Sequence, residues 1–154
     1  MSRMFLTARI TIASPGAAPY TLLTFKIAAT TRVALKSIAI DPGGSTGASV
    51  PLNFDIATVS DDVNQTDDTA NILIKTLPAH AESHALLCYK RNGGVAALDV
   101  GGHYQFSLHQ QSPRVWVPQN KQREIVMAGG KRWAIRQVGG PTGIPLIITV
   151  ELEE

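Results

Sequence analysis

Cysteine is nearly absent from this sequence of 154 residues, and its single copy, Cys88, excludes a disulfide within the chain. A chain of this length buries roughly two thirds of its unfolded surface, so it folds without a disulfide or a structural metal. Cys88 lies within an apolar stretch. That position predicts a buried and chemically inert thiol.

Charge is also scarce. Charged residues make up 17% of the chain, below the roughly 25% of typical soluble domains. This predicts a surface that is partly uncharged or covered by partners. Lys+Arg and Asp+Glu number 14 and 12, so the net charge is 14 − 12 = +2. That balance excludes a histone-like protein and argues against nucleic acid as a main partner.

Long apolar runs are missing as well. No stretch reaches the ~20 residues that span a bilayer, and Arg9 interrupts the first apolar run before it reaches signal-peptide length. We therefore expect no membrane partner and synthesis in the cytoplasm. The chain also lacks the glycine-rich nucleotide motifs and a Ser/His/Asp set with supporting spacing. From the absence of these motifs we expect no catalytic residue and no cofactor, and hence no enzyme.

Apolar and polar residues alternate with a period of two, which is typical of half-buried β-strands. The clearest alternations cover residues 4–12, 23–27, 103–109 and 146–152, and five Gly-Gly pairs mark turns between such segments. Within residues 32–40 the apolar residues move from odd to even positions, and the alternation resumes after Lys36 and Ser37. A single change of phase inside a strand predicts a β-bulge.

These patterns predict one all-β domain over residues 1–154. Eight or nine short strands without a convincing amphipathic helix favour an antiparallel β-sandwich of jelly-roll type. The core between the sheets is predicted from the apolar members of the cleanest alternations: Phe25, Ile27, Phe106, Leu108, Ile135, Ile148 and Val150.

The stretch from Ser60 to Ala70 contains four aspartates and little that could be buried, so we expect a long exposed loop. Residues 67–74 and 78–87 also permit a helical interpretation. The loop fails the EF-hand pattern. A different calcium site remains an alternative to a solvated acidic loop, built from Asp61, Asp62, Asp67 and Asp68.

Two further motifs have ordinary interpretations. His80, Glu82 and His84 stand at spacing two and would share one face of a strand, as a metal site requires. Neighbouring turn-forming residues and the lack of a completing motif favour the absence of a metal. The letters from Gly43 to Gly47 fit a hydrolase nucleophile elbow, but a strand follows where that motif needs a helix. We interpret them as a flexible loop.

The C-terminal third is basic and contains both tryptophans. Its charges alternate with Val115 and Val117, and this pattern fits a solvated outer face, a protein interface or a single-stranded nucleic-acid site. Because Arg and Trp dominate the energetics of protein interfaces, the segment supplies the interface candidates: Arg114, Trp116, Gln119, Lys121, Arg123 and Trp133.

The order of these segments resembles small jelly-roll structural proteins of tailed bacteriophages, of the capsid-decoration or minor-head type. The resemblance covers roughly residues 20–154. It rests on FKIAATTRVALKSIAI at residues 25–40, on Val117-Pro118, on Ala128-Gly129-Gly130 and on the acidic terminal strand at residues 150–154. It implies a virion protein on the capsid surface, with the major capsid protein and copies of itself, as a homotrimer, for partners.

Two other functions remain open. A carbohydrate- or receptor-binding sandwich of a virion tail or fibre would need exposed aromatic residues, for which Tyr20, Trp116 and Trp133 are the candidates. A small cupin-like metal-dependent enzyme would use His80, Glu82 and His84 with a distant histidine.

Overall fold

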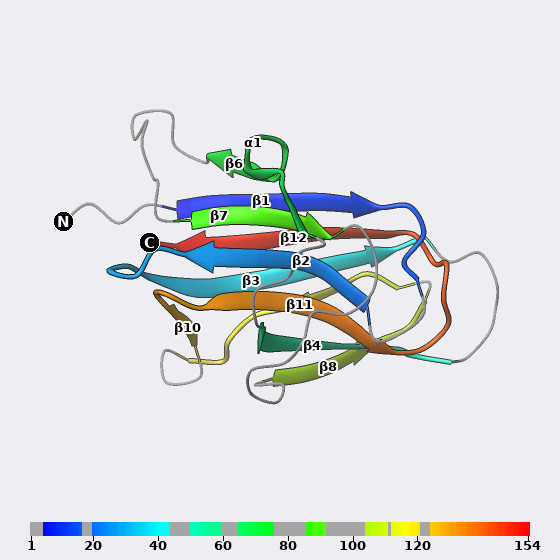
Figure 1. Cartoon of the computed structure of the whole chain (residues 1–154). Helices are drawn as coiled ribbons and strands as arrows, with labels where there is room; N and C mark the ends of the chain where they lie inside the picture. Colours follow the sequence, from blue (N-terminus) through cyan, green and yellow to red (C-terminus); the bar gives the residue numbers. More distant parts are fainter. Residues whose placement is uncertain are drawn as a thin grey trace.

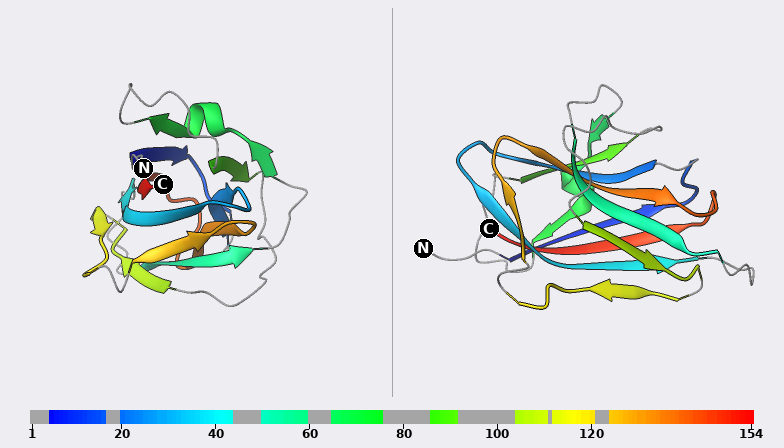
Figure 2. Two further views of the ribbon diagram at one scale, coloured as in Figure 1. Left: turned by 90° about the vertical axis from the view of Figure 1, so that its left-hand side faces the viewer. Right: turned by 90° about the horizontal axis from the view of Figure 1, so that it is seen from below.

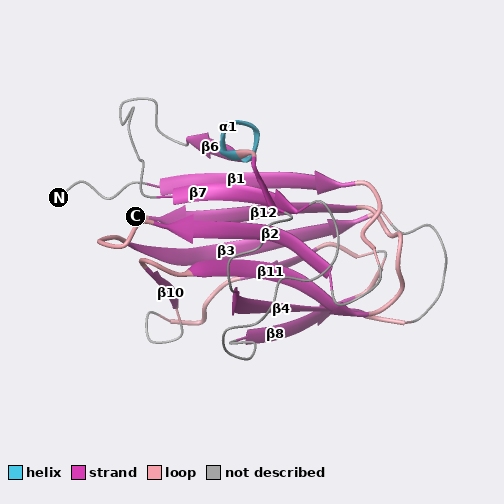
Figure 3. Cartoon of the chain, viewed as in Figure 1, coloured by secondary structure: helices cyan, strands magenta, loops and turns pink. Residues whose placement is uncertain are grey.

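Two antiparallel β-sheets lie face to face and make up most of the structure (Figures 1 and 2). A single short helix accompanies them within the part of the chain that is described (Figure 3). This computed structural model describes residues 5–16, 20–43, 50–59, 65–75, 86–91, 104–110, 112–120 and 124–154. The predicted all-β sandwich is confirmed.

Each sheet has six strands in the described residues. Sheet A runs in the order β10 (Ile125–Ala128), β3 (Arg32–Pro42), β12 (Leu146–Glu153), β1 (Phe5–Ile12) and β6 (Leu73–Lys75), with β9 (Arg114–Trp116) also beside β3. Sheet B runs in the order β5 (Gln65–Asp67), β7 (Leu86–Arg91), β2 (Tyr20–Ile27), β11 (Arg132–Gly139), β4 (Leu52–Val59) and β8 (Tyr104–Leu108).

The connections follow the jelly-roll plan. Eight strand positions alternate between the layers, in the orders β1-β12-β3-β10 and β2-β11-β4-β8, which is the nested arrangement of two Greek keys. The strands β5, β6 and β7 are inserted between β4 and β8 and extend the sheets beyond β2 and β1. The strands β9 and β10 both pair with β3 and together fill the last position of the first sheet order. These additions explain twelve described strands where eight or nine were expected.

The predicted acidic loop is partly wrong. Residues 65–67 form β5 against β7, and the helix α1 (Thr69–Ile72) follows within the stretch for which a helix was an alternative. Asp67 bonds to the first residue of that helix: its Oδ1 accepts from the Thr69 amide at 3.0 Å and from the Thr69 hydroxyl at 2.6 Å. Residues 60–64, with Asp61 and Asp62, lie outside the described residues.

The predicted bulge and core are confirmed. Ser37 pairs with Glu151 and Leu35 with Leu152, so Lys36 is the extra residue of β3. All seven predicted core residues are buried in the main apolar cluster. Cys88 is buried in the same cluster, where desolvation raises the pKa of its thiol to about 12.

The outer faces of the two sheets differ. On sheet B, most outward residues of β4 and β11 are buried, including Asp55 and Arg136, and the others are half-buried. Arg136 donates from Nε to Asp55 Oδ1 at 2.8 Å and from a terminal nitrogen to Oδ2. On sheet A, several outward apolar side chains are exposed, among them Phe5, Val115 and Val126. Sheet A therefore offers the open face of the sandwich.

The Gly129-Gly130 turn between β10 and β11 packs against the connection from β2 to β3. Gly130 has φ +75° and donates its amide to the Ile27 carbonyl at 3.0 Å. A Cβ on Gly129 would stand 2.6 and 2.7 Å from the carbonyl oxygens of Thr31 and Ala29, and closer still to that of Ala28. These neighbours are all backbone, so they cannot rotate away.

We expect Gly129→Ala to lower the free energy of unfolding by about 1–3 kcal/mol, because the added methyl overpacks the turn. Urea denaturation followed by circular dichroism measures the change. Gly43→Ala is the matched control, since a Cβ there meets Pro145 at an ordinary 3.4 Å. Equal losses in the two variants would show that the turn tolerates a side chain.

Candidate functional site

Three rows of side chains cross the outer face of sheet A, because cross-strand partners point to the same side of a sheet. The strand register defines each row. The first row holds Phe5, Glu153, Ala34 and Val126; the second Ile74, Thr7, Glu151 and Ser37; the third Arg9, Thr149, Ala39 and Val115.

Large apolar side chains stand at the ends of these rows, around a polar centre. Phe5 and Val126 end the first row, Ile74 the second and Val115 the third, and all four are exposed. Together with Val117, they account for five of the seven exposed large hydrophobic residues in the described part of the chain. An exposed apolar group of this kind on one face is typical of an interaction surface.

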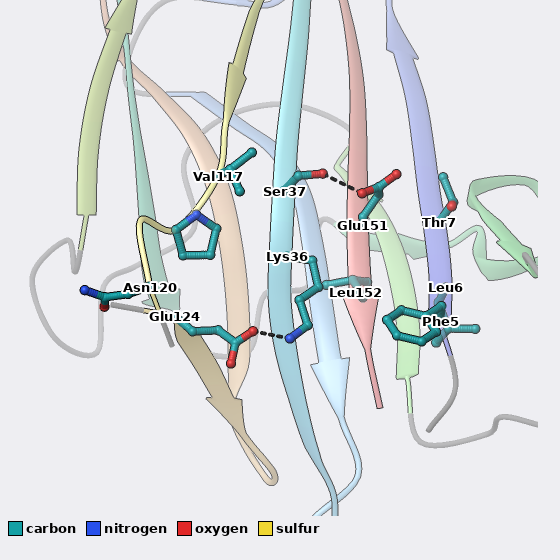
Figure 4. Close-up of a pocket in the computed structure, with 11 residues that line it drawn as sticks. Phe5, Leu6, Thr7, Lys36, Ser37, Val117, Asn120, Glu124, Glu151 and Leu152 are labelled. Atoms are coloured by element: carbon teal, nitrogen blue, oxygen red, sulfur yellow. Dashed lines mark hydrogen bonds and ion pairs between the residues drawn. The ribbon is translucent and has the colours of Figure 1, made fainter. Parts of the chain in front are cut away.

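A pocket of about 570 Å³ opens in this face, and we call it the sheet A pocket. Figure 4 shows Phe5 on one side of it and Val117 on the other, with Ser37 and Glu151 between them. The pocket lies beside Lys36 and Ser37, at the bulge in β3, where neither β9 nor β10 pairs with β3. Its volume lies within the ~300–1,000 Å³ of ordinary ligand pockets.

The bulge places Lys36 between two carboxylates. Its Nζ lies 2.5 Å from Glu153 Oε2 and also contacts Glu124. Hydrogen bonds to Glu124 and then Glu153 raise the pKa of Lys36 above its ordinary 10.5. The stabilisation that Lys36 gains from these two carboxylates is therefore complete below about pH 10.5. It is lost as the pH rises through the higher pKa that Lys36 has in the folded protein. Glu151 accepts instead from the neutral Ser37 hydroxyl at 3.0 Å.

A smaller hollow of about 250 Å³ lies at the open edge of the sandwich, between β8 and β9. The rings of Tyr104 and Trp116 meet there with centroids 5.0 Å apart. Arg114 reaches across the same edge and donates a hydrogen bond to the Ser107 carbonyl. These contacts join the edge strands of the two sheets, so their first effect is structural.

The predicted interface residues divide into three groups. Trp116 and Trp133 are each 8% exposed and belong to the apolar cluster, so neither offers the exposed ring that a sugar-binding site would need, and their part in an interface stays a prediction. Arg114 and Gln119 are exposed and line the smaller hollow together. The remaining two candidates, Lys121 and Arg123, lie outside the described residues.

The two metal alternatives remain predictions. The described acidic pair has local partners, since Asp67 accepts from Thr69 and Asp68 Oδ1 accepts from Asn71 Nδ2 at 2.5 Å. The bonds from Thr69 lower the pKa of Asp67. Within the described residues, no group of three His, Cys, Asp or Glu could hold a metal ion. His80, Glu82 and His84 lie outside that part of the chain.

Sequence reasoning missed the residues that make the sheet A pocket. Phe5 and Glu151 occupy outward positions of clean alternating strands, for which the sequence predicts only a half-buried strand. A phenylalanine at an outward position was the available signal. The pocket itself depends on contacts between the two ends of the chain.

Comparison with protein-family models, with curated proteins and with solved structures finds no match to this chain. Among the described residues, no helix has the length and apolar character needed to cross a membrane.

Proposed function

We propose that the protein is a structural component of a bacteriophage particle, a decoration protein that binds the outside of the head as a homo-oligomer. The observation that carries the proposal is the open outer face of sheet A, with its exposed apolar residues and its pocket. The resemblance to small jelly-roll virion proteins supports the same role. The resemblance also supplies the trimer and the major capsid protein as expected partners.

The surface argument favours a protein partner over a glycan. Sugar-binding sandwiches present exposed aromatic rings, but both tryptophans here are buried and Tyr20 is half-buried. Among the described residues of the open face, Phe5 is the one exposed aromatic residue, and the exposed Tyr104 packs on Trp116 and Phe106 at the edge of the sandwich. Apolar aliphatic residues predominate on the open face, and they suit close packing against another protein. Viral capsid domains, lectins and cupins all use the jelly roll, so the proposal depends on this surface and not on the fold alone.

Binding to heads that lack the protein tests this proposal. We expect saturable binding in co-sedimentation. Val115→Asp should weaken binding at least about tenfold, because it places a carboxylate in the contact at a cost of about 1.4 kcal/mol or more. Val50→Asp is the matched control: Val50 is 53% exposed and Val115 is 61% exposed, but Val50 lies outside the face.

Circular dichroism should show both variants folded. A strict monomer at micromolar concentration that ignores heads would reject the assembly role. Binding to a glycan array without binding to heads would favour the receptor-binding alternative.

A further inference from the structure

The sheet A pocket combines apolar walls with a negative floor. Phe5 and Val117 face each other across it, with Pro118 beside Val117. Among the described side chains that line the pocket or contact Lys36, Glu124, Glu151 and Glu153 carry three negative charges against the positive charge of Lys36, so the sum over these four is 1 − 3 = −2. Since Lys36 contacts Glu124 and Glu153, Glu151 is the carboxylate that a further cation would meet.

We infer that this pocket receives an arginine side chain from a partner protein. An arginine combines an apolar stem with a cationic end. The stem would lie against Val117 and Pro118, and the planar guanidinium would stack on the exposed Phe5 ring while it donates to Glu151. An acidic side chain would be repelled by the excess of carboxylates. A purely apolar side chain would remove water from Glu151 without supplying a cation or a hydrogen-bond donor.

The geometry favours arginine over lysine. Glu151 keeps one oxygen for the Ser37 hydroxyl, which holds the carboxylate in place. A guanidinium presents several donors in a fixed plane, so it reaches the other oxygen while its face stays on the phenylalanine ring. The pocket also lies among the exposed apolar residues of the face. A surrounding protein contact would thus exclude water from the pair and strengthen it.

This inference rests on the proposed assembly role for the identity of the partner, but the pocket can be tested alone. The probe is the capped tripeptide Leu-Arg-Leu, titrated into ¹⁵N-labelled protein and followed by NMR. We expect shifts of the amides of Thr7, Ser37 and Leu152, which line or border the pocket. The same peptide with citrulline in place of arginine keeps the shape and removes the charge. It should bind about three- to tenfold more weakly.

Glu151→Gln should reduce binding of the arginine peptide by a similar three- to tenfold factor, as expected for one charge-assisted bond. Asp41→Asn is the matched control, because Asp41 is an exposed carboxylate on the same face of β3 but outside the pocket. Raising the salt from about 50 to about 500 mM should weaken binding to wild type. Glu151→Gln should keep its fold and show a smaller salt effect.

The inference is overturned if the citrulline peptide binds equally well, if Glu151→Gln binds like wild type, or if the shifts map to another surface. Absence of peptide binding by a protein that binds heads would overturn the pocket's role and leave the assembly role standing. Specific peptide binding by a protein that ignores heads would support the pocket and reject the capsid as its partner.

Discussion

Asp55→Ala should lower the free energy of unfolding by about 3–5 kcal/mol, because it leaves the Arg136 guanidinium buried without its carboxylate. The two residues are 2% and 4% exposed, and they pair directly across the central strands β4 and β11 of sheet B. Their two hydrogen bonds satisfy both carboxylate oxygens. Chemical denaturation in urea gives the size of the loss.

Removing both charges should recover part of that loss. The double variant Asp55→Ala with Arg136→Met carries no buried unpaired charge, so we expect it to be more stable than Asp55→Ala alone. Asp41→Ala, at an exposed carboxylate, should change stability by no more than about 0.5 kcal/mol. A double variant less stable than the single one would show that Arg136 contributes mainly through packing of its stem.

Phe106→Ala should also cost about 3–5 kcal/mol, since it removes a large side chain from the core of sheet B. Phe106 is 7% exposed and stacks on Phe54 with ring centroids 5.6 Å apart. The ring of Tyr104 also packs near Phe106, with ring centroids 6.3 Å apart. The neighbouring rings sit on strands of fixed register, so they cannot collapse fully into the space.

Phe5→Ala provides the matched control for that experiment. Phe5 is 47% exposed and stands on the outer face of sheet A, so its loss should cost under about 1 kcal/mol. Urea denaturation of both variants gives the comparison. Similar losses at the two positions would mean that β8 contributes little to the core, contrary to its register against β4.

The alternating pattern was sufficient to predict the sandwich, its core and the bulge at Lys36. The short strands β5 and β6 were missed because three residues are too few to show a period of two. They form because neighbouring strands supply their hydrogen-bond partners. The jelly-roll order likewise depends on pairings between distant segments, such as β1 with β12.

Strand β9 shows why the candidate site was only partly predictable. Its alternation is clear, but the side that faces the core cannot be read from a strand of three residues. The alternation of charged residues with Val115 and Val117 predicts that the charges lie on the outer face and that these two valines face the core. The register against β3 reverses this, because Trp116 pairs with the buried Ile38 and Val115 with the outward Ala39. The exposed valines therefore lie on the open face.

The pairing of Asp55 with Arg136 was equally hidden. The two residues are 81 positions apart in sequence, and each looks like an ordinary outward charge on an alternating strand. Only the adjacency of β4 and β11 brings them together. A buried ion pair of this kind depends on topology, which a pattern of single strands does not contain.

Cryo-electron microscopy of heads incubated with the purified protein tests the central claim most directly. The account predicts density for the sandwich on the outside of the shell, with the outer face of sheet A, including Val115 and the sheet A pocket, against a protein neighbour. Density that contacts the shell or another copy only through sheet B, or heads without any added density, would contradict it.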